Sequence, residues 1–233
     1  QTYSYLIMPK KNVASNIILA LDTSVNHCSV SLLRNDCLIV EKSSFMQKGQ
    51  SETLLPFIEQ TLDESNLPLK SLKAIGVGVG PGNFTGLRIG ISAAKGLAMA
   101  LKIKVFGVNR FETLIESDQP TLALIKNQSD SFYTQFFINQ KPIQPPVEKT
   151  SSQILKEKYL PNTIISGDCA IHFSKTLSLK PGENDSNPRT EKIGSLALKY
   201  LKTGGPAPKP LYMKGPDAKL PKEPNPPILG SDA

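Results

Sequence analysis

A glycine-rich turn that runs straight into a helix constrains this chain more than any other segment. Residues 76–88 read GVGVGPGNFTGLR, between an apolar strand and a long apolar helix. Glycine permits a positive φ and lets another group approach the main chain closely, while proline fixes φ. Asn83 or Thr85 is placed to cap the helix by accepting from its first free amides. The segment is therefore either an anion-binding nest or a rigid docking platform.

The helix after the turn, residues 84–101, has one face that is almost bare of side chains. Its small residues recur at every fourth position: Gly86, Gly90, Ala94 and Ala98. At 3.6 residues per turn they share one face, and such a smooth face allows a second helix to approach closely. We predict a docking face, with burial against the protein's own sheet as the alternative. Arg88 and Lys95 interrupt the apolar run, so the helix is no membrane span.

The order of the elements predicts the fold class. Apolar runs and turn residues give strand, strand, strand, helix, strand, helix over 17–23, 28–34, 37–45, 50–65, 73–80 and 84–101, with Ser51 as the cap of the first helix. This order is that of the ribonuclease-H-like plan shared by sugar kinases, actin and Hsp70 chaperones.

A weaker second cycle follows the first. Its expected strands are 105–108, 121–126, 131–138 and 163–167, and its expected helices begin at Phe111, at Ser151, after a capping Asp168 and at Thr190. We therefore predict an α/β fold of two tandem ribonuclease-H-like (ASKHA, actin/Hsp70-like) lobes. We divide the chain into four parts. A flexible extension covers 1–16, and the first lobe covers 17–109. A degenerate second lobe covers 110–202, with a last helix that can pack back on the first lobe, and a Pro-rich extended tail covers 203–233.

Composition fits an ordinary globular protein with a substantial core. The 233 residues are 39% hydrophobic and 20% charged, and carry a net charge of +7. Lysines near the start and in the tail could face RNA phosphates or an acidic protein, but we interpret them as ordinary solubilising lysines. Three cysteines without paired spacing argue against a disulfide framework, and the opening residues lack the order of a signal peptide. We expect a cytoplasmic protein.

Two segments could contact a nucleotide. Asp22, Thr23 and Ser24 end the first strand, where the fold plan has its interlobe cleft and where a carboxylate could hold Mg²⁺. An Asp that caps the following turn explains the same pattern. The second segment is the turn itself, with Gly80, Gly82 and Thr85 as candidates.

Motifs for catalysis are missing. His27 and His172 are the two histidines, and neither belongs to an HxxxH or HExxH pair, so no metal site is predicted. The turn lacks the lysine of a Walker A loop, and no serine stands in a GxSxG elbow. We predict no catalytic residue. The enzyme alternatives are an ASKHA-type kinase or hydrolase that uses Asp22, and a vestigial glycoprotease-like metallopeptidase.

Several segments together resemble one protein family. They are residues 18–24 (ILALDTS), 51–56 (SETLLP), 80–90 (GPGNFTGLRIG), 94–98 (AKGLA) and 210–219 (PLYMKGPDAK). In order and spacing they resemble TsaB, also called YeaZ, most closely over residues 17–110. One departure is Gln50, where relatives often carry His.

The resemblance implies a non-catalytic subunit in the bacterial synthesis of threonylcarbamoyladenosine next to the tRNA anticodon. Such a subunit dimerises with the catalytic protein TsaD, is joined by the ATPase TsaE, and meets tRNA only through the complex. It has no cofactor of its own, since the complex uses the ATP and Mg²⁺, and it can form homodimers when alone. The resemblance also implies that the two helices of the first lobe make the partner contact, through Ser51, Leu54, Leu55, Ile58, Phe84, Gly86, Leu87, Gly90, Ala94, Leu97 and Ala98.

Overall fold

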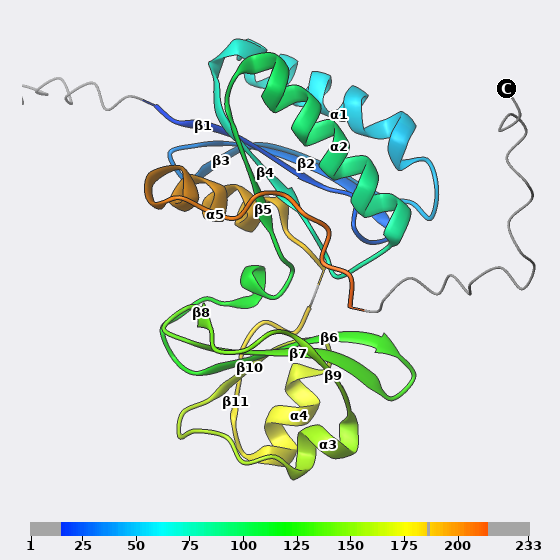
Figure 1. Ribbon diagram of the computed structural model, residues 1–233, viewed down its shortest axis with the longest axis vertical. Helices are drawn as coiled ribbons and strands as arrows, with labels where there is room; N and C mark the ends of the chain where they lie inside the picture. The colour runs from blue at the N-terminus through cyan, green and yellow to red at the C-terminus, as the bar shows by residue number, and fades with distance from the viewer. Residues whose placement is uncertain (1–14, 186, 214–233) are drawn as a thin grey trace, which may run out of the picture.

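The protein has two lobes, stacked one above the other in Figure 1. The computed structural model describes residues 15–185 and 187–213. Each lobe contains one mixed sheet with helices against it, which confirms the predicted α/β fold of two ribonuclease-H-like lobes. Most of the expected extension and most of the expected tail, residues 1–14 and 214–233, lie outside the described part.

The first lobe is built on a five-stranded sheet in the order β3-β2-β1-β4-β5. β1 pairs antiparallel with β2 and parallel with β4, as the predicted order of elements requires. The strands are β1 (Ile17–Asp22), β2 (His27–Arg34), β3 (Cys37–Phe45), β4 (Leu72–Gly78, after the short helix η1, Leu69–Ser71) and β5 (Lys104–Val108). Helices α1 (Gln50–Ser65) and α2 (Phe84–Leu101) cover one face, and α5 (Thr190–Thr203) covers the other.

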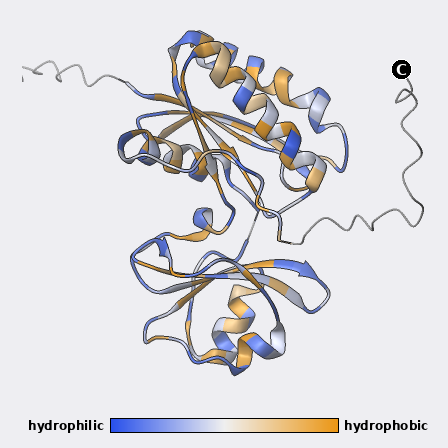
Figure 2. Ribbon diagram, viewed as in Figure 1, coloured by the Kyte–Doolittle hydropathy of each residue, from blue (hydrophilic) through white to orange (hydrophobic). Residues whose placement is uncertain are grey.

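Burial on both faces explains why β1 is apolar as far as its last residue, Asp22. Its sequence, IILALD, is buried at every position. One side chain in two points toward α1 and α2, where Leu19 and Leu21 join the larger core cluster. The others point toward α5, where Ile18 and Ala20 pack with Ile193 and Ala197. Figure 2 shows the same arrangement as hydrophobic strands between helices whose outer faces are more polar. The last helix thus belongs to the first lobe in space.

The second lobe repeats the plan of the first in reduced form. Its sheet has the order β11-β10-β6-β7-β8, with β9 also paired to β7. β6 pairs antiparallel with β7 and parallel with β10, as β1 does with β2 and β4. The elements are η2 (Glu112–Leu114), β6 (Thr121–Gln128), β7 (Ser131–Ile138), β8 (Lys141–Pro142), β9 (Val147–Thr150), α3 (Ser151–Lys156), β10 (Ile164–Gly167), α4 (Ala170–Leu177) and β11 (Lys180–Pro181).

Three local predictions about helix starts are wrong. α1 begins at Gln50 after Gly49, which has φ 99°, so Ser51 lies inside the helix and its hydroxyl donates to Glu52 instead. No α-helix starts at Phe111, where the chain forms only the 3₁₀ turn η2. Asp168 does not cap α4, because its Oδ2 accepts from the backbone N–H of Lys126 in the neighbouring strand.

The smooth face of α2 points inward. Gly86, Gly90, Ala94 and Ala98 are all buried, and the two alanines belong to the cluster beneath α1 and α2. Leu54, Ile58 and Leu87 are at most 4% exposed. The assignment of these seven residues to a partner contact is therefore wrong, and the alternative of burial against the protein's own sheet is correct. Ser51 and Phe84 are exposed.

The start of the tail is fixed to both lobes. The backbone N–H of Gly107 in β5 donates to Pro206 O at 3.0 Å, and that of Leu211 donates to Val79 O at 2.8 Å. A Cβ on Gly107 would lie 2.9 Å from Cα of Pro208, so the tail can cross β5 only because that position is glycine. The side chain of Leu211 packs against a cluster of the second lobe. Residues 206–211 therefore bridge the lobes.

A partly buried carboxylate, that of Glu112, ties α5 to the turn between the lobes. Oε1 of Glu112 accepts from the hydroxyl of Tyr200 at 2.6 Å, and Oε2 accepts from the N–H of Asn109 at 2.9 Å. Burial raises the pKa of Glu112, and the hydrogen bond from Tyr200 partly opposes this. A folded-state pKa above the unfolded value means that stability falls as pH rises from the unfolded pKa through the folded pKa.

We expect Tyr200→Phe to destabilise the protein more at pH 7.5 than at pH 4.5. Loss of the hydroxyl raises the pKa of Glu112 further, so ionising the carboxylate costs more. The expected loss at pH 7.5 is about 2 kcal/mol, the usual size for a hydrogen bond to a charged group. Urea unfolding at both values measures it, with the exposed Tyr212→Phe as control. An equal loss at both pH values would contradict the role of Glu112.

Candidate functional site

The segment after β1 fits into the glycine-rich turn. A Cβ on Gly78 would lie 1.8 Å from Oδ2 of Asp22, and one on Gly82 would lie 2.0 Å from the carbonyl oxygen of Ser24. A Cβ on Gly86 would lie 2.0 Å from the carbonyl oxygen of Thr23. No side chain fits at such distances. The glycines are therefore required by the close approach of the protein's own chain.

Hydrogen bonds hold this segment against the start of α2. The N–H of Asn83 donates to Ser24 O at 2.6 Å, and the hydroxyl of Thr23 donates to Gly86 O at 2.7 Å. Asn83 caps the helix, as predicted, by accepting from the N–H of Gly86 at 2.9 Å. The N–H groups of Asn83 and Gly86 are thus already used within the chain. Residues 22–24 of the protein's own chain therefore occupy the inner side of the turn.

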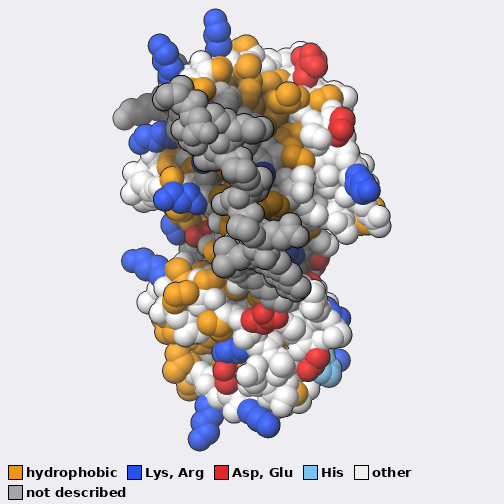
Figure 3. Space-filling model, turned by 45° about the vertical axis from the view of Figure 1, so that its right-hand side comes forward, with side chains coloured by type: hydrophobic (Ala, Val, Ile, Leu, Met, Phe, Trp, Pro, Cys, Tyr) orange, Lys and Arg blue, Asp and Glu red, His pale blue; other side chains and the backbone are white. Residues whose placement is uncertain are grey.

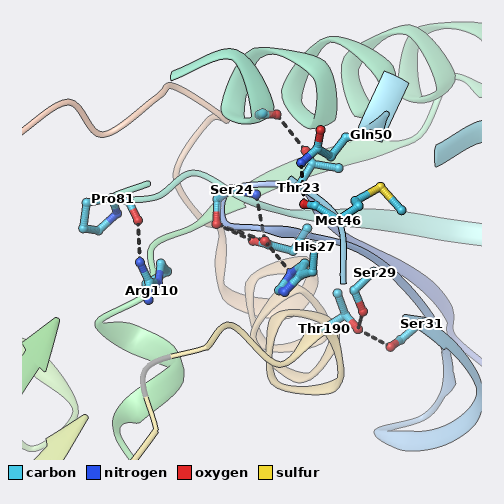
Figure 4. Close-up of polar contacts among 12 residues, drawn as sticks. Thr23, Ser24, His27, Ser29, Ser31, Met46, Gln50, Pro81, Arg110 and Thr190 are labelled. Carbon is cyan, nitrogen blue, oxygen red and sulfur yellow. Dashed lines mark hydrogen bonds and ion pairs between the residues drawn. The ribbon is translucent and has the colours of Figure 1, made fainter. Parts of the chain in front are cut away.

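Asp22 serves as a turn-capping carboxylate. Its side chain is fully buried and accepts from the N–H and hydroxyl of Ser24, both at 2.9 Å from Oδ1. Nε2 of His27 lies 3.0 Å from the same oxygen (Figure 4). Asp22, Thr23 and Ser24 are at most 1% exposed, so contact of these side chains with a nucleotide is incompatible with this conformation. Gly80 is buried too, while contacts of Gly82 and Thr85 stay predictions.

The pair of Asp22 and His27 was missed by the sequence analysis, although a signal was present. The two residues flank a four-residue turn between antiparallel strands, which brings their side chains together. Next to them, burial and the charge of Asp22 raise the pKa of the Cys28 thiol to about 11, so this thiol is protonated at neutral pH. Across residues 15–185 and 187–213, no three His, Cys, Asp or Glu side chains come together to hold a metal ion.

A second missed residue is Arg110, which lies between the lobes. Its Nη1 donates to Pro81 O at 3.0 Å, and its backbone N–H donates to Gly80 O at 2.8 Å (Figure 4). Burial lowers the pKa of this guanidinium, while attraction to Asp22 and to Asp168 of the second lobe opposes the shift. Arg110 therefore fixes the turn before α2 relative to the second lobe. Its signal was an arginine two residues after the end of a strand whose last three residues are buried.

The outer surface of α1 and α2 carries exposed apolar side chains. Leu55 is 56% exposed, Phe84 51% and Met99 80%. In Figure 3 hydrophobic side chains gather over the upper lobe, on the side where Figure 1 places these two helices. We call this surface, formed by the exposed residues of α1 and α2, the α1–α2 surface.

A second small-residue stripe lies on the α1–α2 surface. Ser92, Gly96 and Ala100 stand four apart on α2 and are all exposed. A Cβ on Gly96 would meet no atom within 4 Å. Glycine inside a helix costs about 1 kcal/mol relative to alanine. Nothing within the described chain requires that cost at Gly96, in contrast to Gly86 and Gly90.

The two helices of the α1–α2 surface carry charges of opposite sign. The exposed charged residues of α1 are all acidic, and those of α2 are basic: Glu52, Glu59, Asp63 and Glu64 on α1, Arg88 and Lys95 on α2. At the start of α2, Cζ of Arg88 lies 3.9 Å from the ring centroid of Phe84, and Tyr212 of the tail stacks on that ring at 5.2 Å. The tail therefore contributes Tyr212 to this end of the surface.

Comparisons with known proteins identify the family. A family model described as TsaD, tRNA N6-adenosine threonylcarbamoyltransferase, matches residues 44–134. The tRNA threonylcarbamoyladenosine biosynthesis protein TsaB of Bacillus subtilis is 30% identical over 166 residues, which cover 66% of this chain and 72% of that protein. The chain belongs to the TsaB family. The TsaB of Buchnera aphidicola from Schizaphis graminum is 38% identical over 102 residues, 44% of this chain, and the match spans only about half, 48%, of that relative.

Solved structures agree with the TsaB assignment. YeaZ from Pseudomonas aeruginosa superposes with a TM-score of 0.68 at 25% identity, over 84% of this chain and 99% of that chain. The activator of the 2-hydroxyisocaproyl-CoA dehydratase from Clostridium difficile, solved with bound ADPNP, has a TM-score of 0.50 at 8% identity over 80% of this chain and 96% of that chain, a likeness of fold alone. None of the helices in the described residues is both long and apolar enough to cross a membrane.

Proposed function

We propose that this TsaB-family chain is a non-catalytic subunit that binds a TsaD-like catalytic subunit through the α1–α2 surface. In this role it takes part in the synthesis of threonylcarbamoyladenosine in tRNA. The observation that carries the proposal is Gly96, a glycine in mid-helix with open space in front of it. Small residues on a helix surface let a partner helix approach closely. Exposed Leu55 on α1 and Met99 on α2 supply apolar anchors on the same surface.

The family-model match supports a partner of the same design. Residues 44–134 include both α1 and α2, and they resemble a segment of TsaD. A TsaD-like partner would then present a corresponding pair of helices, and the contact would be a bundle of four helices with approximate two-fold symmetry. In such a bundle, the acidic α1 of one subunit could pair with a basic helix of the other, and the basic α2 with an acidic helix. The same complementarity permits a homodimer when no TsaD-like protein is present.

The interior of the first lobe supports a role without chemistry. An ASKHA-type kinase or hydrolase needs an open carboxylate at the cleft, whereas Asp22 is buried and bonded to Ser24 and His27. The chain would act by holding the catalytic subunit in a competent conformation. ATP and Mg²⁺ would be used by the complex, a TsaE-like ATPase would join it, and tRNA would be reached through the other subunits.

A reconstituted transfer assay tests this function. We expect the purified chain alone to transfer no threonylcarbamoyl group to tRNA. Addition of the TsaD and TsaE of the same organism, with ATP, Mg²⁺ and threonylcarbamoyl-adenylate, gives transfer that falls to background when the chain is omitted. The measurement is the modified nucleoside, quantified by mass spectrometry. Turnover by the chain alone, or full activity without it, would overturn the proposal.

A further inference from the structure

A polar cleft of about 530 Å³ lies beside β2 and β3, on the sheet face that α5 covers. It is separate from the α1–α2 surface, because α1 and α2 lie on the opposite face of the sheet. The register pairs His27 with Phe45, Ser29 with Ser43 and Ser31 with Glu41. Alternate residues of a strand point to the same face, so these pairs form one continuous floor. The wall is the segment 187–189, which leads into α5.

One carboxylate in the cleft is held firmly in place. Oε1 of Glu41 accepts from the hydroxyl of Ser31 at 3.1 Å and from that of Thr190 at 2.8 Å. Ser31 and Thr190 are completely buried, and their hydroxyl oxygens also lie next to each other (Figure 4). Each hydroxyl has one hydrogen, so when both donate to Glu41 neither donates to the other. Within the described residues, Oε2 of Glu41 receives no hydrogen bond. This oxygen is a positioned acceptor for hydroxyl or amino groups of a ligand.

An aromatic ring stands at the mouth of the same cleft. Phe45 is 77% exposed, although it lies in a strand. Its cross-strand neighbour His27 uses Nε2 for Asp22, which leaves the other ring nitrogen on the side of the cleft. Asn26 and Asn187 also line the cleft, and Nδ2 of Asn187 lies 3.4 Å from Asp185. The cleft therefore combines a stacking surface with hydrogen-bonding groups of both kinds.

The charges of the cleft disfavour a phosphate. Arg189 is its one arginine, and that guanidinium lies 2.7 Å from Glu183 and 3.5 Å from Glu116. Glu41 lines the cleft, and Asp22 lies behind His27. A phosphate here would be repelled by the carboxylate of Glu41, while the guanidinium of Arg189 is already paired with two carboxylates.

We propose that this cleft binds a nucleoside without phosphate groups. The base stacks on Phe45, and the two ribose hydroxyls donate to Oε2 of Glu41. The edge of the base reaches the side chains of Asn26 and Asn187. Flat bases stack on aromatic side chains with little dependence on sequence, and a fixed carboxylate suits a pair of hydroxyls.

Titration of the full chain with adenosine, followed by amide NMR shifts, tests the site. We expect saturable shifts confined to β2, β3 and residues 187–190, with ATP binding at least tenfold more weakly. Phe45→Ala should weaken adenosine about tenfold, the scale of one stacking contact. Glu41→Gln should weaken adenosine but not 2′,3′-dideoxyadenosine, which lacks both hydroxyls.

The control is Leu38→Ala, which shortens an exposed side chain of the same strand outside the cleft. It should leave adenosine binding unchanged. Absence of saturable shifts up to 10 mM adenosine, or ATP binding as tight as adenosine, would overturn the assignment. These results would leave the proposed subunit contact untouched, because that contact lies on the opposite face of the sheet.

Discussion

Gly96→Leu should weaken association with the TsaD-like partner about 100-fold while the isolated chain stays folded. A leucine at this position projects from the outer stripe of α2 and holds a partner helix away from Ser92 and Ala100. Loss of close packing on this scale corresponds to roughly 3 kcal/mol of binding free energy. The isolated chain has open space within 4 Å of that Cβ, so the substitution introduces no internal clash. Calorimetric titration with the partner measures the change.

Two control variants make the result specific. Gly96→Ala adds one methyl group and should weaken association much less, while it stabilises the free chain by about 1 kcal/mol through helix propensity. Lys202→Leu adds a leucine to an exposed position of α5, on the other side of the sheet, and should leave association unchanged. Affinity of Gly96→Leu within twofold of the unmodified chain would exclude the α1–α2 surface as the contact.

The order of strands and helices was predictable because it rests on long apolar runs. β1, buried on both faces, reads as an unbroken apolar segment, and the helix-to-strand alternation followed from periodicity. Helix starts were less predictable. Gly49 replaces the expected cap of α1 by adopting φ 99°, which a glycine allows without any side-chain signal.

The orientation of α2 could not be read from its sequence. Two stripes of small residues run along this helix, one through Gly86 and Gly90 and one through Ser92 and Gly96. Spacing of four is the same in both, so periodicity alone cannot tell which faces the sheet. The choice is made by residues 22–24, which are distant in sequence and which fill the space in front of the first stripe.

The hydrogen bonds of Asp22 and of Thr190 could be predicted only in part, because some of them join residues that are distant in sequence. Asp22 was recognised at the end of β1, and its turn-capping role was one of two alternatives. The register pairs Asp22 with Ser29, and His27 lies two residues before Ser29 on the same face of β2, where it reaches the carboxylate. The contact between Thr190 and Glu41 depends instead on α5 returning to the first sheet, a long-range event that no local pattern specifies.

Glycine-to-alanine substitutions along α2 should lower the stability of the chain on the buried stripe and raise it on the exposed stripe. Gly86→Ala places Cβ 2.0 Å from a backbone oxygen of Thr23, which cannot move without breaking the bonds of the 22–24 segment. We expect a loss of about 3 kcal/mol, since overpacking against backbone is among the costliest core substitutions. For a chain of this size that is a fall of roughly 6–12 °C in Tm.

Gly90 and Gly96 complete the series on the same helix. At Gly90→Ala the nearest atom is Oγ1 of Thr23, 2.5 Å from the added Cβ, and a rotating side chain relieves part of that clash. Gly96→Ala meets nothing and should be stabilising. Thermal unfolding should therefore give Tm values that increase from Gly86→Ala through Gly90→Ala to Gly96→Ala. A Tm of Gly86→Ala within 1 °C of the unmodified chain would mean that residues 22–24 do not occupy the turn.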